Sequence, residues 1–202
     1  MIGDVSGKGI PASLLMADVL SRFRSLVHTI ETPSAILESL NNGLCANNPS
    51  GMFITLFCAM LDIEDGKVVF SNAGHNPPVL VSQKNGTDYL KPHNGLVLGG
   101  FPGMIYRNEE LRLAPGDGIF LYTDGVTEAR SEAGGLYTGE RLLKRVEGLC
   151  KEKSREVVDW VMEDVRSFSE KVEQTDDIAM VMFRWTPVDG FHGACVEKTS
   201  QN

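Results

Sequence analysis

Helical periodicity is confined to the two ends of this chain, and the residues between them carry strand patterns. Apolar residues recur at spacings of three and four over residues 11–28. A second such stretch starts at Thr32-Pro33, where Thr32 suits the N-cap and Pro33 the first helical position. The same periodicity returns over residues 138–149 and 154–170. Helices that flank a block of strands predict an α+β fold with helices packed on antiparallel sheets, and they argue against a doubly wound fold.

The central block predicts short strands joined by turns rich in Gly, Asn and Pro. Apolar or alternating segments predict strands over residues 53–63, 68–72, 79–81, near 89, 106–113, 119–122 and 178–183. Met1-Ile2-Gly3 resembles the end of a strand but is too short to form one. The chain of 202 residues is long enough for one domain, which we assign to residues 1–185. The aperiodic residues 186–202 predict a disordered tail.

Three carboxylate positions stand where a predicted strand meets a turn. Asp4 follows the first three residues, Asp124 follows a short apolar strand, and Asp176-Asp177 precedes the last strand. Carboxylates beside apolar runs are partly desolvated, which is unfavourable without a partner. A shared hard cation removes that penalty, and ligand sets made of oxygen suit Mg²⁺ or Mn²⁺. Each Asp alone more often caps a turn, but the three together favour a metal site that activates water for phosphoryl transfer.

The charge and the cysteines exclude several classes of protein. A formal net charge of −8 argues against nucleic acid as the main partner, because phosphate binding needs a basic surface. The 4 cysteines are far apart and form no C-x-x-C, so we expect neither a disulfide framework nor a thiolate zinc site. No apolar run approaches membrane-spanning length, and the N-terminus lacks a signal-peptide pattern. We therefore expect a cytoplasmic protein without membrane contact.

The glycine-rich beginning of the chain admits a second interpretation, a nucleotide-binding P-loop. Residues 3–9 form G-x-x-x-G-K-G, which is one residue short of G-x-x-x-x-G-K-[ST], with Gly9 where a Mg²⁺-binding hydroxyl belongs. A serine hydrolase would need G-x-S-x-G, and the sequence has none. His75 lies in a distinctive NAGHNPP stretch, where such a residue more often holds a loop together than performs chemistry.

Four stretches occur in an order that resembles a known family. They are GDVSGKGIPA at 3–12, NAGHNPP at 72–78, LYTDGVTEA at 121–129 and QTDDI at 174–178. Together they resemble the bacterial SpoIIE/RsbU-type branch of the metal-dependent type 2C (PPM) serine/threonine phosphatases. The resemblance implies an αββα sandwich of two antiparallel sheets flanked by helices. It also implies two Mn²⁺ or Mg²⁺ ions, whose bridging hydroxide hydrolyses a phosphoserine or phosphothreonine.

The resemblance also assigns roles to individual residues and implies partners. Asp4 resembles the metal-bridging acid of the family, with the Val5 carbonyl as a further ligand. Asp124 resembles the metal ligand in the Asp-Gly motif, and Asp176 resembles the last acid, with Asp177 beside it. The usual substrates of such domains are phosphorylated anti-sigma-factor antagonists with a STAS fold, which act in stress or sporulation signalling. Sensor or receiver domains usually precede the phosphatase, and the first two helices resemble the switch through which they act.

One part of the family pattern is missing from this chain. In the family, a strand pair with another metal-binding Asp precedes the acid that Asp4 resembles, whereas only Met1-Ile2-Gly3 precede it here. The sequence therefore predicts a sandwich without its first strands, with an exposed sheet edge that invites pairing. On this interpretation the chain is a fragment with weak activity or none. An inactive module that binds a switch protein remains the alternative to a working phosphatase.

Overall fold

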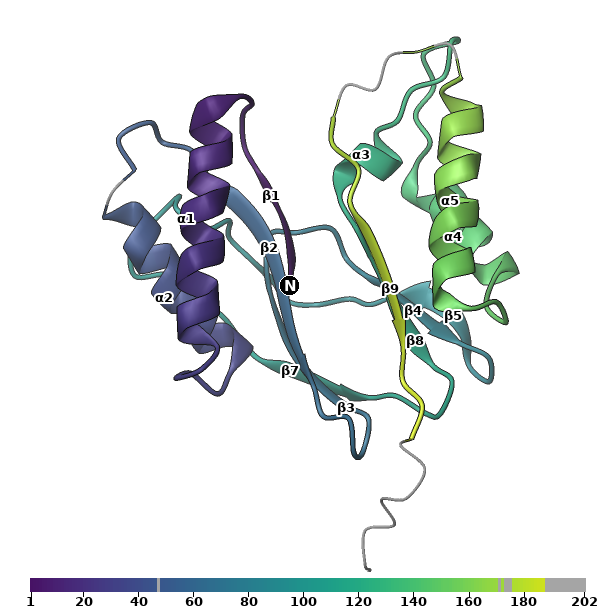
Figure 1. Cartoon of the computed structure of the whole chain (residues 1–202), viewed down its shortest axis with the longest axis horizontal. Coiled ribbons are helices and arrows are strands. Elements are labelled where there is room, and N and C mark those ends of the chain that lie inside the picture. Colours follow the sequence, from purple (N-terminus) through teal and green to yellow (C-terminus); the bar gives the residue numbers. More distant parts are fainter. Residues whose placement is uncertain (47, 171, 173–175, 188–202) are drawn as a thin grey trace, which may run out of the picture.

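Two β-sheets pack face to face with helices on both outer sides (Figure 1). Helices α1 (Ile10–Leu26) and α2 (Pro33–Cys45) cover one sheet, and α4 (Gly139–Gly148) and α5 (Ser154–Phe168) cover the other. The predicted α+β class and αββα arrangement are confirmed. The computed structural model describes residues 1–46, 48–170, 172 and 176–187.

Sheet A is the sheet beneath α1 and α2. It contains β1 (Ile2–Val5), β2 (Ile54–Leu61), β3 (Lys67–Ala73), β6 (Asn94–Gly95) and β7 (Glu109–Arg112). The strands lie in the order β1-β2-β3-β6, and β7 also pairs with β3. All of these pairs are antiparallel except the short parallel pair of β3 with β6. Strand β1 therefore forms an edge of sheet A.

Sheet B is the sheet beneath α4 and α5, and its strand pairs are antiparallel. It contains β4 (Val79–Ser82), β5 (Gly86–Tyr89), β8 (Gly118–Tyr122) and β9 (Met180–Arg184) in the order β5-β4-β8-β9. The short helix α3 (Asp124–Thr127) directly follows β8. Strand β9 forms an edge of sheet B, and Figure 1 shows this edge on the same side of the sandwich as β1.

Alternation along the strands sorts the apolar side chains into layers. In β2, Leu56 packs with Val19 of α1, whereas its neighbour Phe57 packs with Ile119 between the sheets. Successive side chains of a strand point to opposite faces, so each strand contributes to two layers of the core. A buried side chain of this size contributes about 1.5–3 kcal/mol. These layers hold the two sheets in a fixed relation, and with them the strand ends that carry the acids.

The structure corrects the interpretation of the first residues. The prediction that Met1-Ile2-Gly3 cannot form a strand is wrong, because Ile2–Val5 form β1. This strand pairs with β2 from Ile2↔Phe57 to Val5↔Ile54, and the Ile2 side chain is buried. Three residues are too few for a strand only when no partner strand is considered. A short strand is stable when it pairs with a longer one and buries a side chain against it.

Other elements differ less from the prediction. The strand predicted over residues 106–113 is shortened to β7. Tyr106 does not join it because its N–H donates to Glu38 Oε1 of α2 at 3.1 Å and its hydroxyl donates to the Leu96 carbonyl at 3.0 Å. Neither α3 nor β6 follows from the periodicity. Thr32 lies at the predicted N-cap, but its side chain makes no capping hydrogen bond. Of the predicted tail, residues 188–202 lie outside the described residues.

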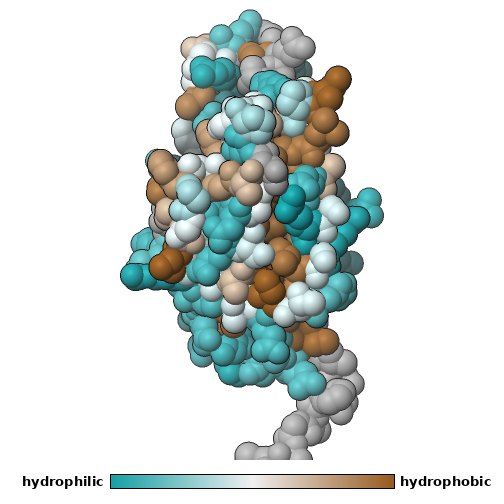
Figure 2. Space-filling view, turned by 90° about the vertical axis from the view of Figure 1, so that its left-hand side faces the viewer, coloured by the Kyte–Doolittle hydropathy of each residue, from teal (hydrophilic) through white to brown (hydrophobic). Residues whose placement is uncertain are grey.

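The exposed surface, the apolar character of the helices and the state of the thiols complete the description of the fold. Figure 2 looks onto the side of the molecule that α1 and α2 cover, where apolar side chains lie among polar ones; Ile10 and Leu14 of α1 are among the exposed apolar residues. No helix in the described ranges offers an apolar stretch of the length that a bilayer requires. Cys45, Cys58 and Cys150 are free thiols, and Cys195 lies outside the described residues.

Candidate metal centre

Asp4, Asp124 and Asp176 converge although they are far apart in the sequence. One carboxylate oxygen from each lies within 4.8 Å of the other two. Asp4 is in β1 of sheet A, Asp124 begins α3 directly after β8, and Asp176 precedes β9 of sheet B. The cluster therefore forms where the two sheets open toward each other, and each sheet supplies part of it.

The pairing of β1 with β2 positions Asp4. Asp4 lies opposite Thr55, and Ile2, on the same face of β1, packs between the sheets. Asp4 therefore points toward sheet B. Gly3 permits this close pairing, because a Cβ at this position would lie 2.6 Å from the Thr55 carbonyl oxygen. Beyond β1, the Ser6 N–H donates to the Phe53 carbonyl at 2.8 Å, and the Ser6 hydroxyl accepts from the Phe53 N–H at 2.7 Å.

Thr123 and Gly125 hold the segment that carries Asp176 against the start of α3. The Thr123 hydroxyl donates to the Asp177 carbonyl at 3.1 Å and accepts from the Ala179 N–H at 2.9 Å. Gly125 leaves room for this contact, because a Cβ there would lie 2.5 Å from the Asp177 carbonyl oxygen. Asp124 and Asp176 are thus brought together by the Thr123 hydroxyl and by the close approach at Gly125, both of which contact the main chain next to Asp176.

The cluster is electrostatically unfavourable by itself. Partial burial raises the pKa of Asp4, and the charges of Asp124, Asp176 and Asp177 raise it further, against a smaller opposite effect of the Val5 main chain. The Asp124 Oδ1 atom is buried and has no hydrogen-bond partner in the described part of the chain. A buried carboxylate oxygen without a donor is costly, and a hard cation satisfies it. The residues present therefore fit Mg²⁺ or Mn²⁺, which prefer oxygen ligands.

Two further predicted ligands lie beside this cluster. Val5 and the exposed Asp177 line the same groove as Asp4 and Asp176. Asp177 is not one of the three carboxylates within 4.8 Å of one another, but its charge still acts on Asp4. The structure thus places Asp4, Asp124 and Asp176 at the centre of the site and the other two residues at its margin.

A groove of ≈ 660 Å³ extends from the acids along α1. Its α1 wall consists of Ala12, Ser13, Met16, Ala17 and Leu20. Among the described residues that line the groove, Lys8, in the turn before α1, carries the positive charge. Met16 belongs to the apolar periodicity of residues 11–28, and nothing in that spacing indicates that part of this helix face borders an open site.

The remaining motifs have structural roles in this geometry. Asn72 and His75 close a loop after β3, since the His75 N–H donates to Asn72 Oδ1 at 2.8 Å and Asn72 Nδ2 donates to the His75 carbonyl at 2.9 Å. This agrees with the interpretation of His75 as a loop residue. The geometry does not support a P-loop, because Gly3 and Asp4 belong to β1 and only residues 6–9 connect it to α1. So short a turn cannot wrap a phosphate chain.

Comparison with known proteins identifies a family and several relatives. The family model described as Stage II sporulation protein E (SpoIIE) matches residues 1–186. The phosphoserine phosphatase RsbU of Bacillus subtilis (strain 168) is 34% identical over 183 residues, which are 91% of this chain and 54% of that protein. The chain therefore spans about half the length of this relative.

Solved structures share the fold at lower identity. The SiaA-PP2C domain of Pseudomonas aeruginosa superposes with a TM-score of 0.78 at 21% identity, covering 91% of this chain and 73% of that one. A structure of RsbU and RsbW domains from Mycobacterium tuberculosis gives a TM-score of 0.74 at 24% identity, covering 92% of this chain and 51% of that one. At these identities the two structures establish the fold alone.

Proposed function

The chain belongs to the SpoIIE family, and from this premise we propose that it is a protein phosphatase that hydrolyses phosphoserine or phosphothreonine. The observation that carries the proposal is the convergence of Asp4, Asp124 and Asp176 beside an open groove. The ligands that these acids offer are all oxygen atoms, which suits hydrolysis by water activated at a bound cation. The similarity to RsbU, which is named a phosphoserine phosphatase, supports the same activity.

We assign Mn²⁺ or Mg²⁺ to this site, two ions in the complete domain, held by Asp4, Asp124 and Asp176. Asp177 and the Val5 carbonyl are the further ligands of the proposal. When bound, such ions lower the pKa of a coordinated water and neutralise negative charge on the phosphate. Main-chain pairing with β2 positions β1, and the Thr123 hydroxyl holds the segment before β9 through two hydrogen bonds to its main chain.

The groove suggests how a phosphorylated side chain is received. A phosphate that approaches the acids meets three negative groups, so it needs a compensating charge. Lys8 lines the groove beside Asp4 and supplies a positive charge that can attract the phosphate. The adjoining α1 wall carries the apolar side chains of Met16 and Leu20, which can contact residues that flank the phosphorylated one.

The finer assignments follow from the resemblance. We propose a phosphorylated anti-sigma-factor antagonist of the STAS type as the substrate, residues 1–185 as the phosphatase domain, and a sensor or receiver domain as its regulator. The solved neighbour that carries an RsbW domain together with an RsbU domain supports a setting in which such phosphatases act with a second signalling module.

Phosphate release tests the activity directly. The chain is incubated with a phosphorylated STAS-type protein and Mn²⁺, and again with a chelator in place of Mn²⁺. Release that requires Mn²⁺ and is lost in Asp124→Asn is the expected result. Asp88→Asn is the matched control, because Asp88 lies in β5 with a side chain 71% exposed. Binding that persists in chelator, without release at any Mn²⁺ concentration, would instead favour an inactive binding module.

A further inference from the structure

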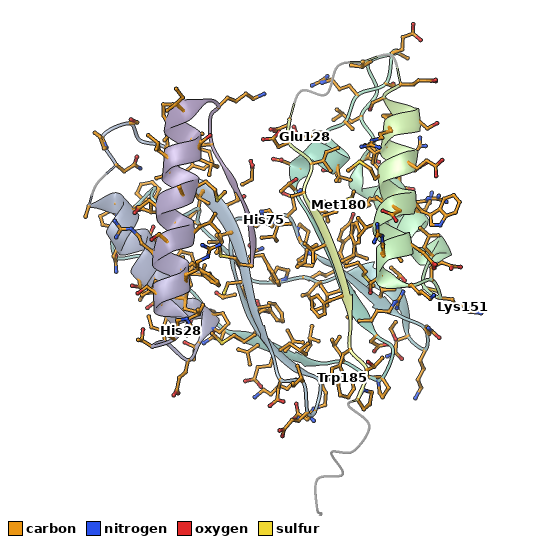
Figure 3. All side chains as sticks on the ribbon, viewed as in Figure 1. His28, His75, Glu128, Lys151, Met180 and Trp185 are labelled. Carbon is orange, nitrogen blue, oxygen red and sulfur yellow. The ribbon has the colours of Figure 1, made fainter. Side chains whose placement is uncertain are left out.

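His75 is a buried polar residue that the proposed reaction does not use. Its side chain is 3% exposed and lies between the two sheets in Figure 3. Its Nδ1 atom shares a hydrogen bond of 2.9 Å with the Thr55 hydroxyl. Closing a surface loop does not require the imidazole, because the Asn72 bonds that close it reach only the His75 main chain. The ring must therefore serve another purpose.

On one side, the ring is connected to the strand pair that carries Asp4. Thr55 lies directly opposite Asp4 in the register of β1 and β2. Directly opposed residues of an antiparallel pair point to the same face, with their Cβ atoms about 4.5–5.5 Å apart. The hydrogen bond from His75 thus fixes the side chain that stands beside Asp4 on the inner face of sheet A.

The other ring nitrogen makes no comparable bond: the Nε2 atom is buried and has no hydrogen-bond partner in the described part of the chain, although the main chain of Tyr122 in β8 partly offsets the effect of burial on the pKa of His75. Tyr122 is followed by Thr123 and then by Asp124. Burial nevertheless lowers the pKa of His75 to about 4, so the ring is neutral at neutral pH and adds no charge to the site. It acts through its hydrogen bond and its volume.

The loop holds the ring in a fixed position between these strands. Asn72, at 2% exposure, makes two hydrogen bonds to the His75 main chain, and Gly74 adopts φ +70, which favours glycine. Leu56 on β2 pairs with Ala73 on β3, so the loop is anchored to the strand that carries Thr55. The loop thus holds the ring in place beside Thr55.

We propose that His75 is a positioning residue: through its hydrogen bond to Thr55 it fixes the inner face of the β1–β2 pair on which Asp4 stands, and so helps to set the separation of Asp4 and Asp124. The inference rests on the proposed function, since the consequence of that separation is the affinity for metal. Residues that orient metal ligands from behind typically change metal affinity by about 10–100-fold when they are replaced.

The test uses a matched pair at Thr55. Thr55→Val removes the hydroxyl at nearly constant volume, and Thr55→Ser keeps the hydroxyl. Titration calorimetry measures the Mn²⁺ dissociation constant, and urea unfolding in chelator measures stability without metal. We expect Thr55→Val to weaken Mn²⁺ binding about tenfold and to lower kcat, and Thr55→Ser to recover most of the affinity. His75→Leu should have an effect that is not additive with Thr55→Val, because both remove one hydrogen bond.

A control separates this role from general destabilisation. Asn41 is also fully buried and ties a loop to α2, through the Phe101 carbonyl at 2.8 Å and the Gly99 N–H at 2.9 Å. Asn41→Ala should lower stability but leave the Mn²⁺ affinity within about twofold, since α2 packs on the opposite face of sheet A. An equal loss of affinity in Asn41→Ala and Thr55→Val would overturn the proposal.

Crystal structures of the metal-free wild type and Thr55→Val give a readout that needs no activity. The carboxylate oxygens of Asp4 and Asp124 should lie farther apart in Thr55→Val than in the wild type, where one oxygen from each lies within 4.8 Å of the other. An unchanged separation overturns the inference even if Mn²⁺ affinity falls. If the wild type neither binds Mn²⁺ nor releases phosphate, the proposed function fails, and the crystal comparison still decides the role of His75.

Discussion

Removing one charge from the acid cluster should stabilise the metal-free protein. Asp4→Asn keeps the shape of the side chain and an acceptor oxygen, but it removes the repulsion with Asp124 and Asp176. Two unit charges 4.8 Å apart, the limit found here, repel by about 0.9 kcal/mol in bulk water and about 3.5 kcal/mol at an effective dielectric constant of 20. Because Asp4 is only partly buried, solvent screening limits the gain in the free energy of unfolding to about 1–2 kcal/mol.

Thermal unfolding followed by circular dichroism measures this gain. For a domain of this size, about 1–2 kcal/mol corresponds to a rise in Tm of about 2–8 °C in chelator. Saturating Mn²⁺ should reverse the order, because a ligand at a hundred times its Kd stabilises by about 2.7 kcal/mol. The wild type has this stabilisation and Asp4→Asn loses most of it. The variant is thus more stable than the wild type without metal and less stable with it.

The exposed Asp88 supplies the control for the same chemical change. Asp88→Asn should move Tm little in either condition, because isolated surface substitutions usually stay within about 0.5 kcal/mol. A metal-free Asp4→Asn protein that melts below the wild type would contradict the repulsion inferred from the geometry. If Mn²⁺ raised the Tm of Asp4→Asn as much as that of the wild type, the assignment of Asp4 as a ligand would be contradicted.

Three further changes probe other parts of the site. The pKa of Asp4 is raised in the folded protein, so protonation of Asp4 stabilises the fold. The Tm advantage of Asp4→Asn in chelator should therefore shrink as the pH falls from neutral toward 3.8, the ordinary pKa of the carboxyl group. Thermal scans at several pH values measure this change. Gly125→Ala should lower the free energy of unfolding in urea by about 1–3 kcal/mol, because the new Cβ would lie 2.5 Å from the Asp177 carbonyl oxygen. Gly148→Ala is the control: a Cβ there would have no neighbour within 4 Å, so this change should be neutral or stabilising. Lys8→Gln should raise KM for a phosphopeptide several-fold in steady-state assays, and an unchanged KM would exclude Lys8 from phosphate binding.

Local patterns in the sequence predicted the helices, the α+β class and the acids that meet, whereas the αββα layering was implied by the resemblance to the SpoIIE/RsbU-type family. The spacing of apolar residues gave the helices of both ends, with bounds within a few residues of α1, α2, α4 and α5. The acids were recognisable because each stands where an apolar strand ends, a place where an unpaired carboxylate is unfavourable. These are short-range signals, which a single sequence contains in full.

Features that depend on contacts between distant segments were not predictable in this way. Strand β1 exists because β2 pairs with it, and β7 is short because Glu38 and Leu96 bind Tyr106. The contact between Gly125 and the Asp177 carbonyl joins segments on either side of α4 and α5. The same holds for the hydrogen bond between Thr55 and His75, since no local pattern relates the two residues.

The site is held together by contacts that oppose its own electrostatics. Mutual repulsion would drive Asp4, Asp124 and Asp176 apart, yet the β1–β2 register, the Thr123 hydrogen bonds and the close approach at Gly125 fix each segment through its main chain. A site assembled by metal alone would have its acids on mobile side chains and loops. Because these contacts do not involve the carboxylates themselves, a cation bound by the three acids should relieve their repulsion without also having to order the segments that carry them. Folding and metal binding are therefore thermodynamically linked: the stability of the fold should rise as the site is occupied by metal.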